Sequence, residues 1–269
     1  MARSALKKRP DRAQREARLL TIVTDHEPSI ATKPFPDAQH AGAAFAWGGE
    51  RYFGIATAVA PGTPYDESIG ELRRFGQALA KLHSVRAFGD AGVDRAEQVD
   101  HSRSDHHEGS LVDQISPVTA TAADCVDRGR PTDSGRRSIC HGDAWPGNGR
   151  FGAHAVTLFD FEHASIGDPV RDFANVAWWL TGLQQPSDTI AKLWTAFLEG
   201  YDEGHDPLRP DLSSLSYHVL LVELRRCTFS ATSSGSPEVE RSIKAGTQQL
   251  VSIWRDRMVP KNGLMSNGW

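Results

Sequence analysis

Cysteine and long apolar runs are both scarce in this chain of 269 residues. Its three cysteines, Cys125, Cys140 and Cys227, form an odd set without C-x-x-C spacing. That number and spacing exclude a disulfide framework and a zinc cluster and favour a reduced, cytoplasmic location. No run approaches the ~18 apolar residues of a membrane span. The basic N-terminus also lacks the apolar segment that follows the start of a secretory signal. We therefore expect a cytoplasmic protein.

A strong net charge is absent as well. With 30 Lys and Arg against 34 Asp and Glu, the formal charge is only −4, which argues against a general nucleic-acid binder. Residues 1–18 nevertheless carry seven Lys or Arg and two acids, so the remainder is acidic. This acidic excess would suit a cationic small substrate; ordinary solubilising charge is the alternative. At 39% hydrophobic residues, the chain can bury a core in one large domain or two lobes.

The most informative stretch is H-G-D-A-W-P-G-N at residues 141–148, followed by an apolar run that ends at Asp160. Phosphoryl transfer from a nucleotide needs such groups. One carboxylate orients the acceptor hydroxyl and takes its proton, while an amide oxygen and a second carboxylate hold magnesium. Asp143 and Asn148 can face a common centre, and a buried strand at 156–159 would deliver Asp160 to it. The alternative is a polar hairpin whose Asp and Asn only make turns, which does not explain an apolar strand ending in Asp-Phe-Glu.

Together with D-F-E-H-A-S-I-G-D-P-V-R-D-F-A at residues 160–174, this motif resembles the aminoglycoside phosphotransferase family, a small-molecule branch of the protein-kinase-like fold. The specific motifs cover about residues 139–175, and a looser resemblance covers about residues 5–84. The resemblance implies an α+β protein of two lobes. A small β-containing N-lobe would span residues 1–60, and a larger, mainly helical C-lobe would span residues 61–269.

The resemblance also implies roles for single residues. Asp143 would be the catalytic base, and Asn148 and Asp160 would hold Mg²⁺ on the phosphates of ATP. His141 belongs to the catalytic motif, where we expect it to hold the loop by hydrogen bonding rather than to move protons. Asp172 would be a structural brace that bonds back to the catalytic loop.

By the same resemblance, the first sixty residues would contribute to nucleotide binding. Lys7, with Lys8 as its rival, corresponds to the strand lysine that grips the phosphates and pairs with a helix glutamate, here Glu16. A solvated basic tail is the alternative. Backbone groups near Ala58 to Ala60, in the expected hinge between lobes, would bond the adenine edge.

Glycine is missing from the first forty residues, and only six residues precede Lys7. A full kinase-like N-lobe has two strands and a phosphate-covering loop before that lysine, and six residues are too few for them. We therefore expect a truncated or reduced N-lobe, with weakened nucleotide affinity and rate. A protein that has lost ATP turnover is the alternative.

Hydrophobic spacing predicts the remaining elements. Aromatic residues on both sides of Gly48-Gly49 predict a β-hairpin within residues 41–58. Apolar residues from Ile69 to Leu82 recur at helical spacing and predict a core-facing helix, with His83 as a satisfied core histidine. The other expected elements are a strand at 138–140 and helices at 173–180 (buried nearly all round), 188–201, 211–230 and 237–257.

The predicted activity is transfer of the γ-phosphate of ATP, with Mg²⁺, to a hydroxyl of a small molecule such as an aminoglycoside-type antibiotic. The motifs say nothing of the acceptor, so a housekeeping kinase of choline, an amino sugar or homoserine is equally compatible. A kinase-like binding module with lost catalysis is the remaining alternative. The acids Glu199, Asp202, Glu203 and Asp206 are candidates for binding a cationic acceptor, or are exposed helix-end acids without function.

Overall fold

The computed structural model divides the chain into two compact units. The first comprises Met1–Ala96 and Gly135–Pro210, and the second comprises Glu97–Ser134 and Asp211–Trp269. The predicted lobe boundary at residue 60 stays a prediction. The structure describes residues 10–35, 44–47, 50–53, 55–85, 137–183, 185–204, 210–219 and 221–223.

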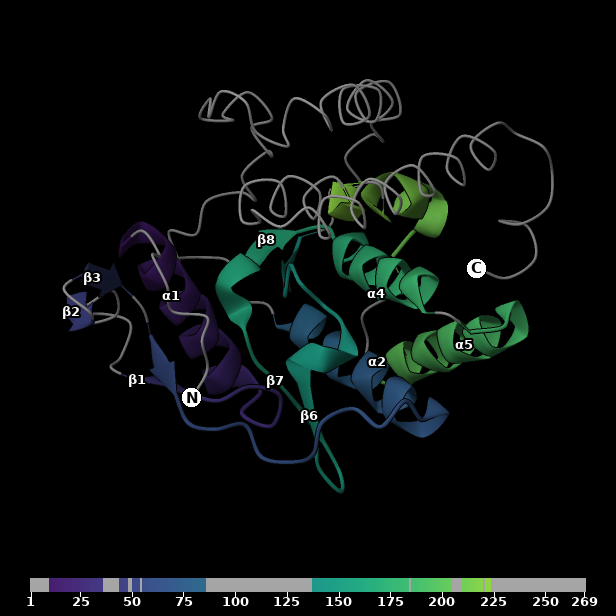
Figure 1. Ribbon diagram of the computed structural model, residues 1–269, viewed down its shortest axis with the longest axis horizontal. Coiled ribbons are helices and arrows are strands. Elements are labelled where there is room, and N and C mark those ends of the chain that lie inside the picture. Colours follow the sequence, from purple (N-terminus) through teal and green to yellow (C-terminus); the bar gives the residue numbers. More distant parts are fainter. Residues whose placement is uncertain are drawn as a thin grey trace. The chain divides into compact units, whose positions relative to one another are not determined.

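The first unit begins with helix α1, Pro10–His26, which appears in purple in Figure 1. Its buried side chains recur every three or four residues, because one face of a helix packs on the core. They include Ala13, Glu16, Ala17, Leu20 and Val23. The helix expected after the basic N-terminus is thus confirmed. The lysines expected before it, Lys7 and Lys8, lie outside the described residues.

Two short antiparallel ladders follow α1. Strand β1, Pro34–Phe35, pairs with β4, Ala56–Thr57. Strand β2, Ala44–Trp47, pairs with β3, Glu50–Phe53, in a register that places Trp47 opposite Glu50. This register leaves two residues to connect the strands, which confirms the predicted hairpin. The Gly48-Gly49 turn itself lies outside the described residues.

Helix α2, Ile69–Ser84, is the predicted amphipathic helix. The hydroxyl of Ser68 caps it by accepting the N–H of Glu71 at 3.1 Å, a common way to satisfy the free donors of a first turn. Four expected core positions, Leu72, Phe75, Leu79 and Leu82, have no exposed surface. Ile69 was expected on the same face but is 50% exposed, because it starts the helix at the edge of the packed surface.

Four short strands frame the motif region. Strand β5, Ser138–Cys140, pairs antiparallel with β8, Ser165–Gly167. Strand β6, Gly149–Phe151, pairs antiparallel with β7, Val156–Leu158. All residues of β5 and β7 are buried, so both predicted apolar strands are confirmed.

Helices α4, Val170–Gly182, and α5, Ser187–Glu203, complete the first unit. Phe173 of α4 packs edge-on against aromatic rings of α5, at centroid distances of 5.1 Å to Phe197 and 4.6 Å to Tyr201. Edge-to-face pairs of this kind add to the stabilisation from burial alone. The predicted burial of α4 holds over most of its surface; Trp178 and Trp179 are half-buried.

Helices α2 and α5 pack with their backbones in close contact. A methyl group added at Gly76 of α2 would overlap the backbone carbonyl oxygen of Phe197, and one added at Gly200 of α5 would overlap the carbonyl oxygen of Arg73. Only glycine fits at these two positions. The close approach places the end of α5 beside the middle of α2.

The described part of the second unit is short. It contains a 3-10 turn, η4, at Leu212–Ser214, which Asp211 caps by accepting the N–H of Ser213 at 2.9 Å. The helix predicted over 211–230 is seen only in part, and the one over 237–257 lies outside the described residues. Nowhere in the described part of the chain is a helix both long and apolar enough to cross a membrane.

We expect Gly76→Ala to lower the free energy of unfolding by about 1–3 kcal/mol, because the added methyl group overpacks a rigid backbone contact. Urea denaturation measures this loss. Gly70→Ala in the same helix is the matched control, since an added methyl group there meets nothing within 4 Å. Alanine also favours a helix over glycine, so the control should be neutral or slightly stabilising. Equal losses in the two variants would contradict the packing argument.

Candidate functional site

The H-G-D-A-W-P-G-N segment forms the connection between β5 and β6. It leaves β5 after Cys140 and ends in a 3-10 turn, η2, at Pro146–Asn148. Gly142 has a φ of 81°, and a methyl group added there would overlap the carbonyl oxygen of His163. A side chain is therefore excluded twice, by the left-handed backbone and by the close approach of a second segment. The glycine of the motif keeps the 141–148 loop pressed against the segment after Asp160.

Asn148 and Asp143 are joined by two hydrogen bonds. The Nδ2 of Asn148 donates to the backbone carbonyl of Asp143 and to its carboxylate Oδ2, each at 2.9 Å. Both partners only accept, so the amide nitrogen must face Asp143, which leaves the amide oxygen Oδ1 turned away. Asn148 is buried and Asp143 is half-buried. The expected convergence of these two residues is therefore present in the structure.

The backbone of Phe159 ties β7 to the same loop. Its N–H donates to the carbonyl oxygen of Asn148 at 3.0 Å, and its own carbonyl accepts from His141 Nε2 at 2.9 Å. Asp160 follows directly, with φ 64° and ψ 57°, a left-handed conformation that is uncommon for a side chain other than glycine. Its carboxylate Oδ1 is buried. The strand thus brings Asp160 to the 141–148 loop, as the sequence predicts.

His141 is fully buried inside the loop. A carbonyl can only accept, so the contact with Phe159 requires a hydrogen on Nε2. The ring also packs on Phe161, with centroids 4.5 Å apart, and its buried Nδ1 bonds to none of the described residues. The expected loop-holding hydrogen bond is present. The place of His141 among the catalytic residues stays a prediction.

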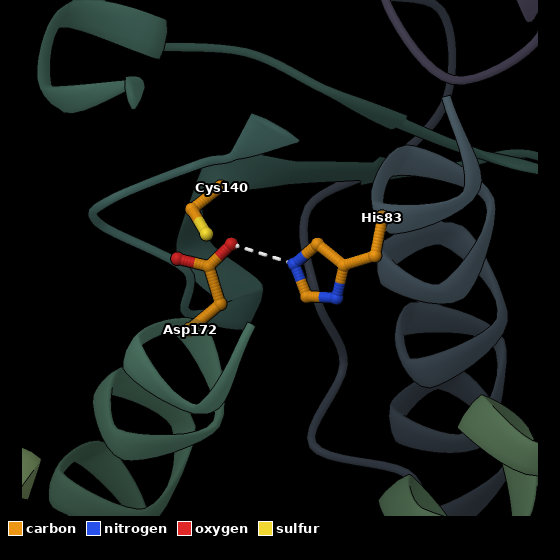
Figure 2. Close-up of side chains that lie close together, drawn as sticks. All are labelled: His83, Cys140 and Asp172. Carbon is orange, nitrogen blue, oxygen red and sulfur yellow. Dashed lines mark hydrogen bonds and ion pairs between the residues drawn. The ribbon is translucent and has the colours of Figure 1, made fainter. Parts of the chain in front are cut away.

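Asp172 braces the loop from α4. Its carboxylate accepts the backbone N–H of His141 at 2.6 Å and that of Gly142 at 2.8 Å. It also accepts from His83 Nε2 at 3.0 Å (Figure 2). The predicted brace is confirmed. Burial by itself would raise the pKa of Asp172, but the hydrogen bond from His83 and the Gly142 N–H oppose it and hold the pKa below its ordinary value of 3.8.

His83, Cys140 and Asp172 place ligand-type atoms within 4.8 Å of one another (Figure 2). Both oxygens of Asp172 already accept hydrogen bonds. Burial, with the Asp172 charge second, raises the pKa of the Cys140 thiol well above its ordinary value, so the thiol keeps its proton and contacts the Asp168 carbonyl at 3.4 Å. The group is a hydrogen-bonded core. The expectations of a satisfied His83 and of a strand at 138–140 are confirmed, and the strand ends at the buried Cys140.

Tyr201 is the residue of this network that the sequence reasoning missed. Its hydroxyl lies 2.9 Å from His83 Nδ1, and the two residues are 118 positions apart in the chain. Neither a motif nor a spacing links them. Only the close packing of α2 on α5 reveals the pair.

The residues expected to bind the nucleotide stand as follows. Glu16 is buried in α1, while its expected partner Lys7 lies outside the described residues. Ala58 is exposed and Ala60 half-buried, in an irregular stretch that follows β4. Contacts of Lys7, Glu16, Ala58 and Ala60 with ATP stay predictions.

Two of the acids considered for acceptor binding pair instead with Arg73 of α2. Its guanidinium lies 3.5 Å from Glu199 and makes two hydrogen bonds to Glu203, one of them 2.9 Å long. These carboxylates therefore take part in joining α2 to α5, which favours the alternative without a binding function. Asp202 is exposed, and Asp206 lies outside the described residues.

The arrangement of strands, helices and loop is an α+β fold of the protein-kinase-like class. Solved structures of similar fold include the amicoumacin kinase hAmiN in complex with AMP-PNP, Ca²⁺ and Ami, with a TM-score of 0.68 and 12% identity over 89% of this chain and 77% of that chain. A microcompartment-associated aminopropanol kinase has a TM-score of 0.68 and 16% identity over 96% and 84% of the two chains. Spectinomycin phosphotransferase APH(9)-Ia, with ADP and spectinomycin, has a TM-score of 0.58 and 13% identity over 86% and 78%. Identities this low establish the fold alone.

The sequence itself matches the profile of the phosphotransferase enzyme family, APH, over residues 2–210. The chain belongs to this family. A sequence search among curated proteins returned no match. The predicted family and fold class are thus both confirmed, and phosphoryl transfer to small molecules is the activity for which the similar structures are named.

We expect Asp172→Asn to lower the free energy of unfolding by about 3–5 kcal/mol at pH 7, because it disrupts a buried carboxylate that accepts three N–H groups and places an amide N–H against one of those donors. The pKa of Asp172 is lower in the folded protein than its ordinary 3.8. Its stabilising contribution is therefore complete above pH 3.8 and is lost as the pH falls through the folded-state value.

Urea denaturation at several pH values checks both parts of this prediction. The gap between Asp172→Asn and the parent protein should be constant above about pH 5 and shrink in acid. Asp188→Asn, at an exposed position in the first turn of α5, is the control and should change stability by no more than about 1 kcal/mol. A gap that widened in acid would contradict the brace.

Proposed function

We propose that the protein transfers the γ-phosphate of ATP to a hydroxyl group of a small molecule, with Asp143 as the base. The observation that carries this proposal is the assembly of Asp143, Asn148 and Asp160 around one loop. Asn148 bonds directly to Asp143. Phe159, the residue before Asp160, donates its backbone N–H to the carbonyl oxygen of Asn148. These are the three groups that phosphoryl transfer requires.

The orientation of the side chains supports Mg²⁺ as the metal. Asn148 turns its amide nitrogen to Asp143, so its oxygen is left for a cation. Asp160 offers a carboxylate with a buried oxygen. Oxygen donors of this kind suit Mg²⁺, which is bound in such sites by one or two protein groups plus phosphates. Asn148 and Asp160 would hold the ion, which when bound would neutralise charge developing on the phosphates.

Asp143 is placed to act as the base. Its Oδ2 is held by Asn148, whereas Oδ1 bonds to none of the described residues and can accept the hydrogen of the acceptor hydroxyl. The hydroxyl oxygen then bonds to the γ-phosphorus as the bond from phosphorus to the ADP oxygen breaks, and the proton passes to Asp143. The two hydrogen bonds from Asn148 fix the Asp143 carboxylate before the acceptor binds, which lowers the entropic cost of orienting the base.

The acceptor is proposed only as a class. Structures of similar fold are named for amicoumacin, spectinomycin and aminopropanol. A screen with labelled ATP should therefore cover these three compounds together with an aminoglycoside, choline, an amino sugar and homoserine. Cationic acceptors would suit the acidic excess of the chain beyond residue 18.

We expect Asp143→Asn to reduce transfer by about 10²–10⁴-fold, the usual contribution of a general base. The amide keeps the shape of the carboxylate, so the thermal midpoint should stay close to that of the parent protein. Labelled phosphate transfer in the acceptor screen and a thermal scan measure the two effects. Full activity in Asp143→Asn would exclude Asp143 as the base.

We expect Asn148→Ala and Asp160→Asn to raise the Mg²⁺ concentration needed for half-maximal rate by at least tenfold, because the first removes an oxygen ligand and the second replaces an anionic ligand with a neutral amide. Initial rates over a Mg²⁺ titration at saturating ATP measure the shift. Asp188→Asn serves as the matched control for loss of an exposed carboxylate and should leave the titration unchanged. Unaltered Mg²⁺ curves in both site variants would remove these residues from the metal site.

A further inference from the structure

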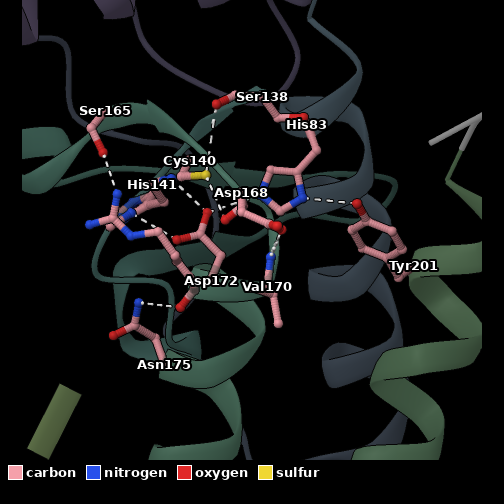
Figure 3. A network of polar contacts seen from close by, with 12 residues as sticks. His83, Ser138, Cys140, His141, Ser165, Asp168, Val170, Asp172, Asn175 and Tyr201 are labelled. Carbon is pink, nitrogen blue, oxygen red and sulfur yellow. Dashed lines mark hydrogen bonds and ion pairs between the residues drawn. The ribbon is translucent and has the colours of Figure 1, made fainter. Parts of the chain in front are cut away.

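A buried chain of polar side chains leads from α5 to the 141–148 loop (Figure 3). Tyr201 Oη lies 2.9 Å from His83 Nδ1, and His83 Nε2 lies 3.0 Å from Asp172. Asp172 in turn accepts the backbone N–H groups of His141 and Gly142. Tyr201, Asp172 and His141 are completely buried, and His83 is 4% exposed.

The hydrogen positions in this chain are assigned for a neutral His83 ring. A carboxylate only accepts, so His83 must carry a hydrogen on Nε2 to bond Asp172. In the neutral ring, Nδ1 is then an acceptor, and it receives the hydroxyl hydrogen of Tyr201. The Tyr201 hydroxyl therefore selects the one tautomer of His83 that points an N–H at Asp172.

The aromatic ring of Tyr201 is held independently of its hydroxyl. It packs against Phe173 at a centroid distance of 4.6 Å and against the His83 ring at 5.6 Å. Loss of the hydroxyl alone would leave this packing in place. The Nδ1 of His83 would then be a buried acceptor without its donor, a state that favours rotation of the imidazole or exchange of its tautomer.

Either change weakens the hold on the loop. Asp172 would lose the N–H of His83 and could shift, and the two backbone N–H groups that it binds belong to the residues immediately before Asp143. A displacement of about 1 Å at a reacting group can cost roughly 10²-fold in rate. We propose that Tyr201 is a positioning residue for phosphoryl transfer, whose hydroxyl acts through His83 and Asp172 to hold the loop that carries Asp143. This inference rests on the proposed function.

The test compares Tyr201→Phe with Tyr65→Phe. Tyr65 also loses a hydroxyl that contacts the backbone, 3.4 Å from the Ser68 carbonyl, but it lies outside the buried chain. With the acceptor that the screen identifies, kcat of Tyr201→Phe should fall by about 10–100-fold while KM for ATP changes less than about twofold. Tyr65→Phe should alter neither constant. Unchanged kcat in Tyr201→Phe overturns the proposal.

A second measurement does not depend on activity. Hydrogen exchange should be faster at the His141 and Gly142 amides in Tyr201→Phe than in the parent protein and in Tyr65→Phe. Nitrogen NMR of the histidine rings should show the Nε2–H form of His83 in the parent and a tautomer mixture in Tyr201→Phe. Unchanged exchange overturns the proposal. If exchange is faster in Tyr201→Phe but the parent protein transfers no phosphate, the hold on the loop is supported and only the proposed function is refuted.

A double-mutant comparison isolates the route through His83. In a His83→Gln background the histidine tautomer no longer exists, so adding Tyr201→Phe should reduce kcat by less than about twofold further. Residues that act through one another give strongly non-additive effects of this kind. If the double variant instead loses kcat by the product of the two single-variant reductions, Tyr201 acts by another route and the proposal is overturned.

Discussion

The carboxylate of Asp172 is the interaction on which the candidate site depends. An ionised carboxylate without solvent contact is costly unless it is paired and fully hydrogen-bonded. Asp172 meets this condition with three N–H donors, two from the backbone of the loop and one from His83. Because each donor comes from a defined position, satisfying the charge also sets the path of the loop between β5 and η2.

The residues that support the loop of the candidate site differ from the one that we propose reacts. His141, Asp172 and His83 are buried and bond to one another or to backbone. Asp143 is half-buried and keeps one oxygen clear of the described residues, which suits a group that must meet a second molecule. Rigid, buried partners around a more open carboxylate are the arrangement that the role proposed for Asp143 requires.

Sequence reasoning succeeded where the interacting residues are near one another in the chain. Asn148 reaches Asp143 across five positions, and the alternation from loop to buried strand placed Asp160 correctly. It was less successful across long separations. Arg73, for example, bonds to Glu203, which lies 130 positions away in the chain. A second difference concerns the start of a helix: Ile69 is exposed although its spacing matches the buried face of α2. Periodicity shows which face of a helix is apolar. How far along the helix that face is covered depends on the other elements that pack against it.

The sequence by itself determined the family, the α+β class and the order of groups along the loop and hairpin, because these follow from short-range spacing and local hydrogen bonding. Only the tertiary structure decided that Tyr201, His83 and Asp172 form one chain. The physical reason is that these residues come from three separate helices. Their contact requires the glycines of α2 and α5 to bring two backbones together, and such packing leaves no periodic signal in the sequence.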